Sequence, residues 1–337
     1  PGGFDFQRDA YFQRLGAVGT VTGPIERASQ FDAATPGARM SAGIERARNG
    51  LTARIVAVIG GSTGAIAAAL VTGKRGEISE RDNESWRAAG VYHIISISGL
   101  HMMLAAGLFF WSARVILALL PGFSLRHSTK KHAAVVAMLG ATAYNMFSGG
   151  EVAAERALIM TLVMLGAILV DRPALAMRNL AISAFIVLSL RPETLLGPSF
   201  QMSFGAVAGL IAYGETMRAL RERNLVSAHA REDGWATRGG RLLLDFVATS
   251  LIAGLATAPF QAYHFHRLNP YGLLGNTLAI PLCSFLVMPA ALLGVLLYPL
   301  GLDAPAWWAM GQGVAMISHA AFAVAQLEGA IAAIGRY

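Results

Sequence analysis

Long apolar stretches, separated by short polar and basic segments, dominate the chain from residue 91 to its end. A helix that crosses a bilayer core about 30 Å thick needs roughly 17 to 25 apolar residues. Seven segments are long enough: 91–120, 132–149, 153–170, 195–213, 246–263, 273–300 and 306–327. An eighth, 178–190, is shorter but is flanked by Asp171, Arg172 and Arg191. The pattern predicts an all-α polytopic membrane protein, a bundle of about eight transmembrane helices.

The amino-acid composition agrees with this prediction and excludes several kinds of site. The 337 residues are 55% hydrophobic and 14% charged, whereas an average soluble domain is about 25% charged. No period-2 alternation typical of a membrane β-barrel occurs. A single cysteine, Cys283, excludes an internal disulfide and a cysteine-based zinc site. The net charge of +7 is common in multi-spanning proteins, so charge alone does not indicate a nucleic-acid ligand.

Basic residues concentrate in every second connection between the expected spans. Eleven lie in three of these connections, and the alternate connections hold about two or three. The eleven are Arg126, Lys130, Lys131, Arg172, Arg178, Arg218, Arg221, Arg223, Arg231, Arg238 and Arg241. An excess of Lys and Arg marks cytoplasmic loops. With eight spans, both termini then face outward, into the periplasm of a two-membrane bacterium.

The first ninety residues differ from the rest. Residues 1–35 are polar and punctuated by Gly and Pro, with short β-like runs such as "AVGTV", and predict the end of a small external β domain. Residues 36–90 predict external or interfacial helices, and 54–73 either just spans or lies in the interface. "TGKRG" is not a phosphate loop, because Lys74 is followed by Arg75 instead of Ser or Thr. The start "PGGFDF" has no methionine or signal core, which indicates a piece of a longer protein.

"HIISISGLH" places two histidines, two serines and a glycine in an expected span. At about 100° per residue, His93, Ser96, Ser98 and His101 cover roughly 200° of a helix. A continuous helix does not turn all four toward one partner, whereas a break near Ser98 and Gly99 gathers them around a cavity. Non-helical backbone at membrane depth is tolerated against protein or water. The alternative is that the serines bond to carbonyls four residues back and the histidines sit near the interface.

A second polar cluster lies in "AYNMFSGGEVAAERALIMT". Glu151 and Glu155 share a helix face, and Arg156 points about 100° from Glu155 and needs another partner. Intramembrane charges cost about 2.5 to 3.5 kcal/mol and usually mark a pathway or a pair. An interfacial turn with a snorkelling arginine is the alternative. Asn145 and Gly149 complete the candidate set here.

Weaker polar signals follow in later spans. "PSFQMSFG" contributes Gln201 and Ser203, and "GNTLAIPL" contributes Asn276 and Pro281. Residues of this kind more often join helices to one another than line a pore. His264 and His266, in "YHFHRLN", fall at a span end, where an interfacial belt is commoner than a metal site. The sequence predicts neither a metal site nor a cofactor.

These motifs resemble those of the ComEC family of DNA-uptake channels, which carry a His-x-x-x-x-Ser-Gly-x-His element. The resemblance rests on "GVYHIISISGLHMMLA", "LVTGKRGEIS", the "SGGEVAAER" segment, "RPETLLGPSFQMSFGAVAGLI" and "NPYGLLGNTLAIPL", in that order over roughly residues 50–290. "PGGFDFQRDAYFQRLGAVGTV" is similar to the end of the family's OB-like external domain. The His-x-His-x-Asp-His element of the family's metallo-β-lactamase-like domain does not occur.

The resemblance implies a division into an OB-like remnant (1–35), external or interfacial helices (36–90) and a transmembrane competence domain (91–330). It implies passage of single-stranded DNA through the bacterial inner membrane during natural transformation, without catalysis by this chain. Single-stranded DNA and membrane lipids are the expected partners. Other DNA-uptake proteins and a second copy of the chain stay open as partners.

Two alternatives from other classes remain. Ser98 beside a histidine is similar to the dyad of an intramembrane serine hydrolase, because His101 lies one turn away on the same helix. A small-solute transporter fits the same composition. The residue pattern alone does not predict DNA binding. Proteins that bind single strands use basic grooves lined with aromatic side chains, and here only scattered candidates such as Arg156, Tyr144 and Tyr213 occur.

Overall fold

The computed structural model describes residues 10–12, 15–17, 19–20, 22–24, 35–225, 235–330 and 332–333, and most of this part of the chain is helical. The helices are α2 (Pro36–Ile59), α3 (Gly61–Thr72), α4 (Glu80–Ala88), α5 (Tyr92–Ile95), α6 (Gly99–Ala118), α7 (Pro121–Ser124), α8 (Thr129–Phe147), α9 (Val152–Leu169), α10 (Met177–Leu190), α11 (Pro198–Leu225), α12 (Trp235–Phe265), α13 (Gly272–Leu282), α14 (Met288–Leu297) and α15 (Ala304–Ala325). Shorter elements are the 3₁₀ turns η1 (Pro192–Leu196) and η3 (Tyr298–Leu300), the π-helical turn η2 (Cys283–Val287), and the antiparallel pair β1 (Arg267–Leu268) and β2 (Ala332–Ala333).

Each of the eight segments expected to span is helical. Among the described residues, three helical stretches are long and apolar enough to cross a membrane: Gly99–Ala118, Val152–Leu169 and Gly272–Leu300. The count of about eight spans is therefore not confirmed. Helix α10 has only 14 residues, about 21 Å at 1.5 Å per residue, and α8 carries Lys130 and Lys131 in its first turn.

Residues 54–73 do not form one continuous spanning helix. The helix stops at Ile59 and a new one begins at Gly61, because Gly60 and Gly61 both take positive φ, at 78° and 54°. The twelve-residue α3 is buried continuously from Gly64 to Thr72. Its small side chains allow other helices to approach closely, so α3 is an interior helix.

The two ends of the described chain pack together into what we call the core unit: α2–α5 with α13–α15. One hydrophobic cluster joins these helices and includes Ile66, Trp86 and Trp307. An ion pair also links them, since Arg54 on α2 donates to Asp303 before α15 at 2.9 and 3.2 Å. Trp307 Nε1 donates to the same carboxylate at 2.6 Å.

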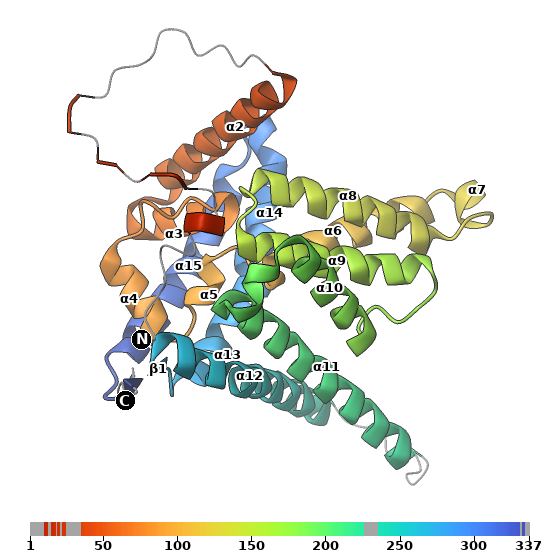
Figure 1. Cartoon of the computed structure of the whole chain (residues 1–337). Helices are drawn as coiled ribbons and strands as arrows, with labels where there is room; N and C mark the ends of the chain where they lie inside the picture. Colours follow the sequence, from red (N-terminus) through yellow and green to blue (C-terminus); the bar gives the residue numbers. More distant parts are fainter. Residues whose placement is uncertain are drawn as a thin grey trace.

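The helices between, α6–α12, form what we call the middle bundle (Figure 1). Helices α6, α8 and α9 share one apolar cluster, and residues of α9, α10 and α11 share another. Helices α11 and α12 pack along each other at Gly205 and Gly209. A Cβ at Gly205 would lie 3.0 Å from the Phe260 ring, and one at Gly209 3.1 Å from Ala256 Cβ.

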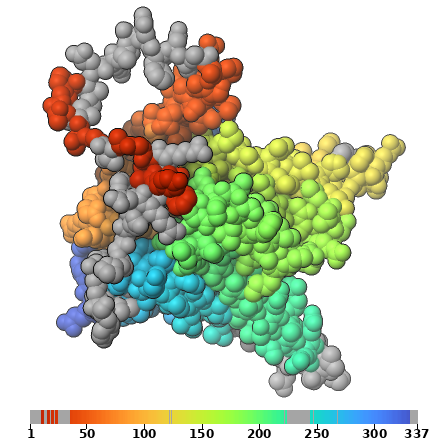
Figure 2. Space-filling view, in the orientation of Figure 1, coloured from red at the N-terminus to blue at the C-terminus, as the bar shows by residue number. Residues whose placement is uncertain are grey.

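The α6–α8 and α9–α10 connections, which the sequence predicts to be cytoplasmic, lie at one end of the middle bundle. Lys131, at the start of α8, pairs with Asp171, after α9, at 2.6 Å, so the first two basic connections are adjacent. The α7 end and the far ends of α11 and α12 project as two arms on the side away from α4 (Figure 1, Figure 2). The opposite end of the middle bundle faces the core unit.

Candidate pathway entrance

The polar motif breaks its helix where the sequence predicts. Helix α5 ends at Ile95, and α6 begins at Gly99. Ser96 and Ser98 between them have extended backbone, with ψ of 136° and −177°. A predicted break near Ser98 and Gly99 is thus confirmed, although it shortens the spanning part to Gly99–Ala118.

Ser98 and His101 form a helix N-cap. Ser98 is the N-cap of α6, and the two side chains make a reciprocal capping box. The backbone N–H of Ser98 donates to His101 Nδ1 at 3.4 Å, and Ser98 Oγ lies 3.3 Å from the same nitrogen. Such a box satisfies donors that the first turn of a helix leaves free. The expected alternative, serines bonding to carbonyls four residues back, is wrong for Ser98.

His93 and Gly99 are placed differently from His101. His93 is exposed, and its Nδ1 lies 3.2 Å from the carbonyl of Gly90. His101 is fully buried, and its Nε2 has no hydrogen-bond partner. A Cβ added at Gly99 would meet nothing within 4 Å. The break therefore has open space on one side and a buried, unpartnered imidazole nitrogen on the other.

The α8–α9 turn meets this break. Gly149 and Gly150 take positive φ, at 97° and 58°, and reverse the chain before Glu151, the N-cap of α9. Arg75 donates to Glu151 at 2.5 Å, and Ser96 Oγ donates to the other carboxylate oxygen at 3.5 Å. Glu151 therefore links "TGKRG", the polar break and the α8–α9 turn.

The acids of the second cluster do not face one shared partner. Glu155 pairs with Arg191 at the end of α10, at 2.9 Å. Arg156 is buried, and its Nη1 donates to the carbonyl of Val152 at 3.2 Å, one turn back. Its Nε has no partner. The partner that Arg156 needs in place of Glu155 is thus a backbone carbonyl, and one N–H of its guanidinium stays without an acceptor.

The later polar residues lie on α11 and α13. Gln201 Oε1 lies 2.8 Å from His264 Nε2, so α11 and the end of α12 are joined by side chains. Ser203 is half-buried. Asn276 has a buried Oδ1 without a partner. Pro281 lies inside α13, just before the π-helical turn η2, and its ring removes one backbone donor from the helix.

Most of the candidate residues share one end of the middle bundle. They lie at or near the starts of α6, α9 and α11 and the ends of α8 and α12. Asn276 and Pro281 lie on α13 of the core unit. The alternating direction of these helices brings their ends together, and we call this the polar end. Hydrogen bonds join Ser96 to Glu151 and Gln201 to His264, but they extend to neither Asn276 nor Ser203 among the described residues.

Buried polar atoms without a partner concentrate in the candidate set. The described residues have seven such side-chain atoms, and four belong to predicted site residues: His101 Nε2, Asn145 Oδ1, Arg156 Nε and Asn276 Oδ1. Tyr144 Oη, beside Asn145, is a fifth. Buried polar atoms in proteins are almost always hydrogen-bonded to protein or water. These atoms therefore indicate hydration or a ligand at the polar end.

A family model described as Competence protein matches residues 70–337. The chain belongs to the competence protein family. Membership confirms the resemblance carried by the sequence motifs. The first 69 residues lie outside the match.

Three curated relatives have names that refer to competence or recombination. The chain is 29% identical to ComE operon protein 3 of Bacillus subtilis over 71% of this chain and 27% of the relative. It is 26% identical to Recombination protein 2 of Haemophilus influenzae over 87% and 34%, and 29% identical to Competence protein ComA of Neisseria gonorrhoeae over 63% and 27%. It thus spans about a quarter to a third of their lengths. No solved structure matches.

Sequence reasoning missed one part of the polar end of this competence-family chain. "TGKRG" was rejected as a phosphate loop and then used only for the family resemblance, yet Gly73, Lys74 and Arg75 form contacts to α2 and to the α8–α9 turn. The signal was two cations beside a glycine, within a segment that resembles the family. Within the described part of the chain, no group of three His, Cys, Asp or Glu side chains is placed to hold a metal ion.

Proposed function

We propose that this competence-family chain forms a channel for single-stranded DNA across the bacterial inner membrane during natural transformation. The match to the competence protein family carries the proposal, and the unpartnered buried polar atoms of His101, Asn145 and Arg156 at one end of the middle bundle support it. Water or a polar polymer supplies the missing partners there. Lipid tails do not, because hydrocarbon offers no hydrogen bonds.

The charges at the polar end suit transit rather than tight binding. Arg75 pairs with Glu151, and Arg191 pairs with Glu155, so these cations are balanced. A conducting site has to bind weakly enough for release. Neutral polar atoms on His101, Asn145 and Asn276 offer such contacts to bases and sugars without holding phosphates strongly.

The orientation follows the loop charges. We place the α6–α8 and α9–α10 connections in the cytoplasm and the polar end, with helices α2–α5 of the core unit, toward the outside. The pair between Lys131 and Asp171 supports a common side for these two connections. The polar end is then where DNA enters. The prediction that residues 1–35 are the tail of an OB-like domain concerns a segment of which only short pieces are described.

The uptake experiment uses the gene's own host. Cells that lack the gene should lose internalised labelled DNA while DNA still binds at the surface. Restoring the full-length gene should return internalisation. Internalisation that persists without the gene would contradict the proposal. Flux of a small solute that depends on the gene, with DNA uptake unaffected, would favour the transporter.

Orientation is tested by thiol labelling after Cys283→Ala. Single cysteines replace Ser128, before α8, and Leu196, which is 61% exposed in η1 at the polar end. An impermeant maleimide should label Leu196→Cys in intact cells, and both positions after permeabilisation. Labelling of Ser128→Cys in intact cells would reverse the proposed orientation.

A further inference from the structure

Arg48 on α2 joins the ends of two other helices. Its guanidinium donates to the carbonyl of Thr72, the last residue of α3, at 2.7 and 3.1 Å. It reaches the carbonyl of Ser148, the C-cap of α8, at 3.4 Å. Carbonyls at a helix C-terminus lack helical partners and carry partial negative charge. The Arg48 guanidinium thus donates to the C-terminal end of one helix in the core unit and of another in the middle bundle.

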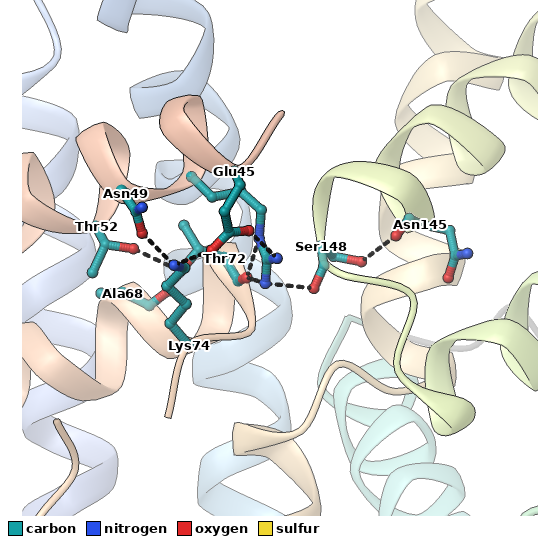
Figure 3. Close-up of polar contacts among 9 residues, drawn as sticks. Glu45, Asn49, Thr52, Ala68, Thr72, Lys74, Asn145 and Ser148 are labelled. Atoms are coloured by element: carbon teal, nitrogen blue, oxygen red, sulfur yellow. Dashed lines mark hydrogen bonds and ion pairs between the residues drawn. The ribbon is translucent and has the colours of Figure 1, made fainter. Parts of the chain in front are cut away.

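Acidic and basic neighbours hold Arg48 in place. Glu45 pairs with Arg48 at 2.8 Å and also accepts from Lys74, which in turn donates to Asn49. The hydrogen bond from Lys74 lowers the pKa of Glu45 below its ordinary value. Figure 3 shows Glu45, Asn49, Thr72 and Lys74 grouped beside α2 and α3, with Ser148 facing them from the end of α8.

Two glycines allow this approach. Gly73 has a φ of 76°, and a Cβ there would lie 2.5 Å from the carbonyl oxygen of Ser148. Gly149 has a φ of 97°, and a Cβ there would lie 2.6 Å from Arg48 Nη2. A side chain at either position would be strained. At Gly73 it would strike the backbone of α8's end, and at Gly149 it would displace the Arg48 guanidinium. The contact is therefore built into "TGKRG" and "SGGE" together.

The same turn reaches the polar break by a second route. Arg75 follows Gly73 and Lys74 and pairs with Glu151, which contacts Ser96 in the break before α6. Side chains on α2 and after α3 therefore hold the α8–α9 turn on both sides of its two glycines. The turn's position relative to the break depends on these contacts.

We propose that Arg48 is a positioning residue that clamps the C-terminal ends of α3 and α8 and thereby sets the geometry of the polar end. The inference rests on the proposed function, since it assigns a role to the entrance of that pathway. Arg48 acts through the α8–α9 turn and Glu151, and it needs no contact with the transported strand. Lysine keeps the charge but not the planar fork that reaches both carbonyls.

A buried reporter tests the clamp without transport. Ser148 is fully buried, so Ser148→Cys in a Cys283→Ala background should react slowly with maleimide in detergent micelles. Adding Arg48→Met should raise the rate at least about tenfold, and Arg48→Lys should raise it less. Arg46→Met is the matched control, because exposed Arg46 donates to the carbonyl of Ala42 in its own helix, the one hydrogen bond it makes among the described residues. An unchanged rate in Arg48→Met overturns the clamp.

Transport is measured in parallel, as DNA internalised per inserted protein. Arg48→Met should lower it about tenfold, Arg48→Lys should recover part, and Arg46→Met should match wild type. Faster labelling with unchanged uptake overturns the positioning role and leaves the channel proposal intact. Uptake that persists in cells lacking the gene overturns the channel proposal, whatever the labelling shows. Arg75→Glu should also reduce uptake, and adding Glu151→Arg should restore it.

Discussion

The core unit and the middle bundle bury their large side chains very differently. Of the twelve largest fully buried side chains described, nine lie in the core unit, among them Trp86, Ile66 and Trp307. The middle bundle turns large apolar side chains outward: Trp111 is 65% exposed and Phe185 74%. The core unit has an interior of large side chains, although its candidate span Gly272–Leu300 also exposes Phe285 (84%). The middle bundle buries few large side chains and relies on an apolar phase around it.

Buried charge follows the same division. Asp303 in the core unit is served by Arg54 and by Trp307. Arg156 in the middle bundle is buried with an unused donor, and His101 and Asn145 also keep polar atoms without a partner among the described residues. Buried charge is therefore paired in the core unit and only partly paired in the middle bundle. Neutral polar atoms without a partner occur in both regions, since Trp86, Asn276 and Ser318 of the core unit also have one each.

The largest difference should appear when one tryptophan is removed from each region. Trp307→Ala leaves a cavity in the densest packing, where Gly294 approaches the ring closely, and should cost about 3–5 kcal/mol of unfolding free energy. Trp111→Ala removes a side chain that faces the apolar surroundings and should cost under about 1 kcal/mol. Thermal unfolding in one detergent measures both. Equal losses would refute the division into two packing regimes.

Substitutions at Gly99 and His101 test whether the polar break takes part in DNA uptake. A Cβ at Gly99 meets nothing within 4 Å, so Gly99→Leu should add bulk beside the break at normal abundance, and uptake should fall about tenfold. His101→Leu removes both polar atoms and should also reduce uptake, whereas His101→Asn should retain part because its amide still donates and accepts. Uptake is normalised to membrane-inserted protein. Normal uptake in both leucine variants would show that the motif is structural only.

Sequence patterning predicted the helices well, and their assembly poorly. Apolar periodicity located α6, α8, α9 and α10 within a few residues, and glycine at Gly99 indicated the break. The apolar pattern did not predict the number of membrane spans, because whether a helix faces lipid or protein depends on helices that are distant in sequence. Arg54 and Asp303, 249 residues apart, show why. The Arg48 clamp was invisible for the same reason, since its acceptors are backbone carbonyls of remote helices.

Acid should weaken the core unit through Asp303. The hydrogen bond from Arg54 holds the pKa of this carboxyl below its ordinary value, and Trp307 adds a second donor. An unfolded aspartate titrates near about 3.9. The stabilisation is therefore fully present above that pH and is lost as pH falls through the lower folded pKa. The difference in melting temperature between wild type and Asp303→Asn should shrink between about pH 5 and pH 2.

A control separates this effect from general acid unfolding. Glu215→Gln on α11 removes an exposed carboxyl from the middle bundle. Its melting temperature should track that of wild type across the same pH range. A constant difference between wild type and Asp303→Asn at every pH would contradict the assignment to Asp303.

The smallest expected effect concerns Ser98. As the N-cap of α6, it contributes helix stability, so Ser98→Ala should cost about 0.5–2 kcal/mol and leave most uptake intact. A serine hydrolase would instead lose activity almost entirely. Asparagine separates the two roles, because it caps a helix as well as serine does but has no hydroxyl nucleophile. Ser98→Asn should regain the stability lost in Ser98→Ala and keep uptake near wild type. The hydroxyl would be shown to react if Ser98→Ala and Ser98→Asn both lost uptake at normal protein level while Ser98→Thr kept it. In that case the Ser98–His101 contact at 3.3 Å would be a catalytic pair rather than a cap.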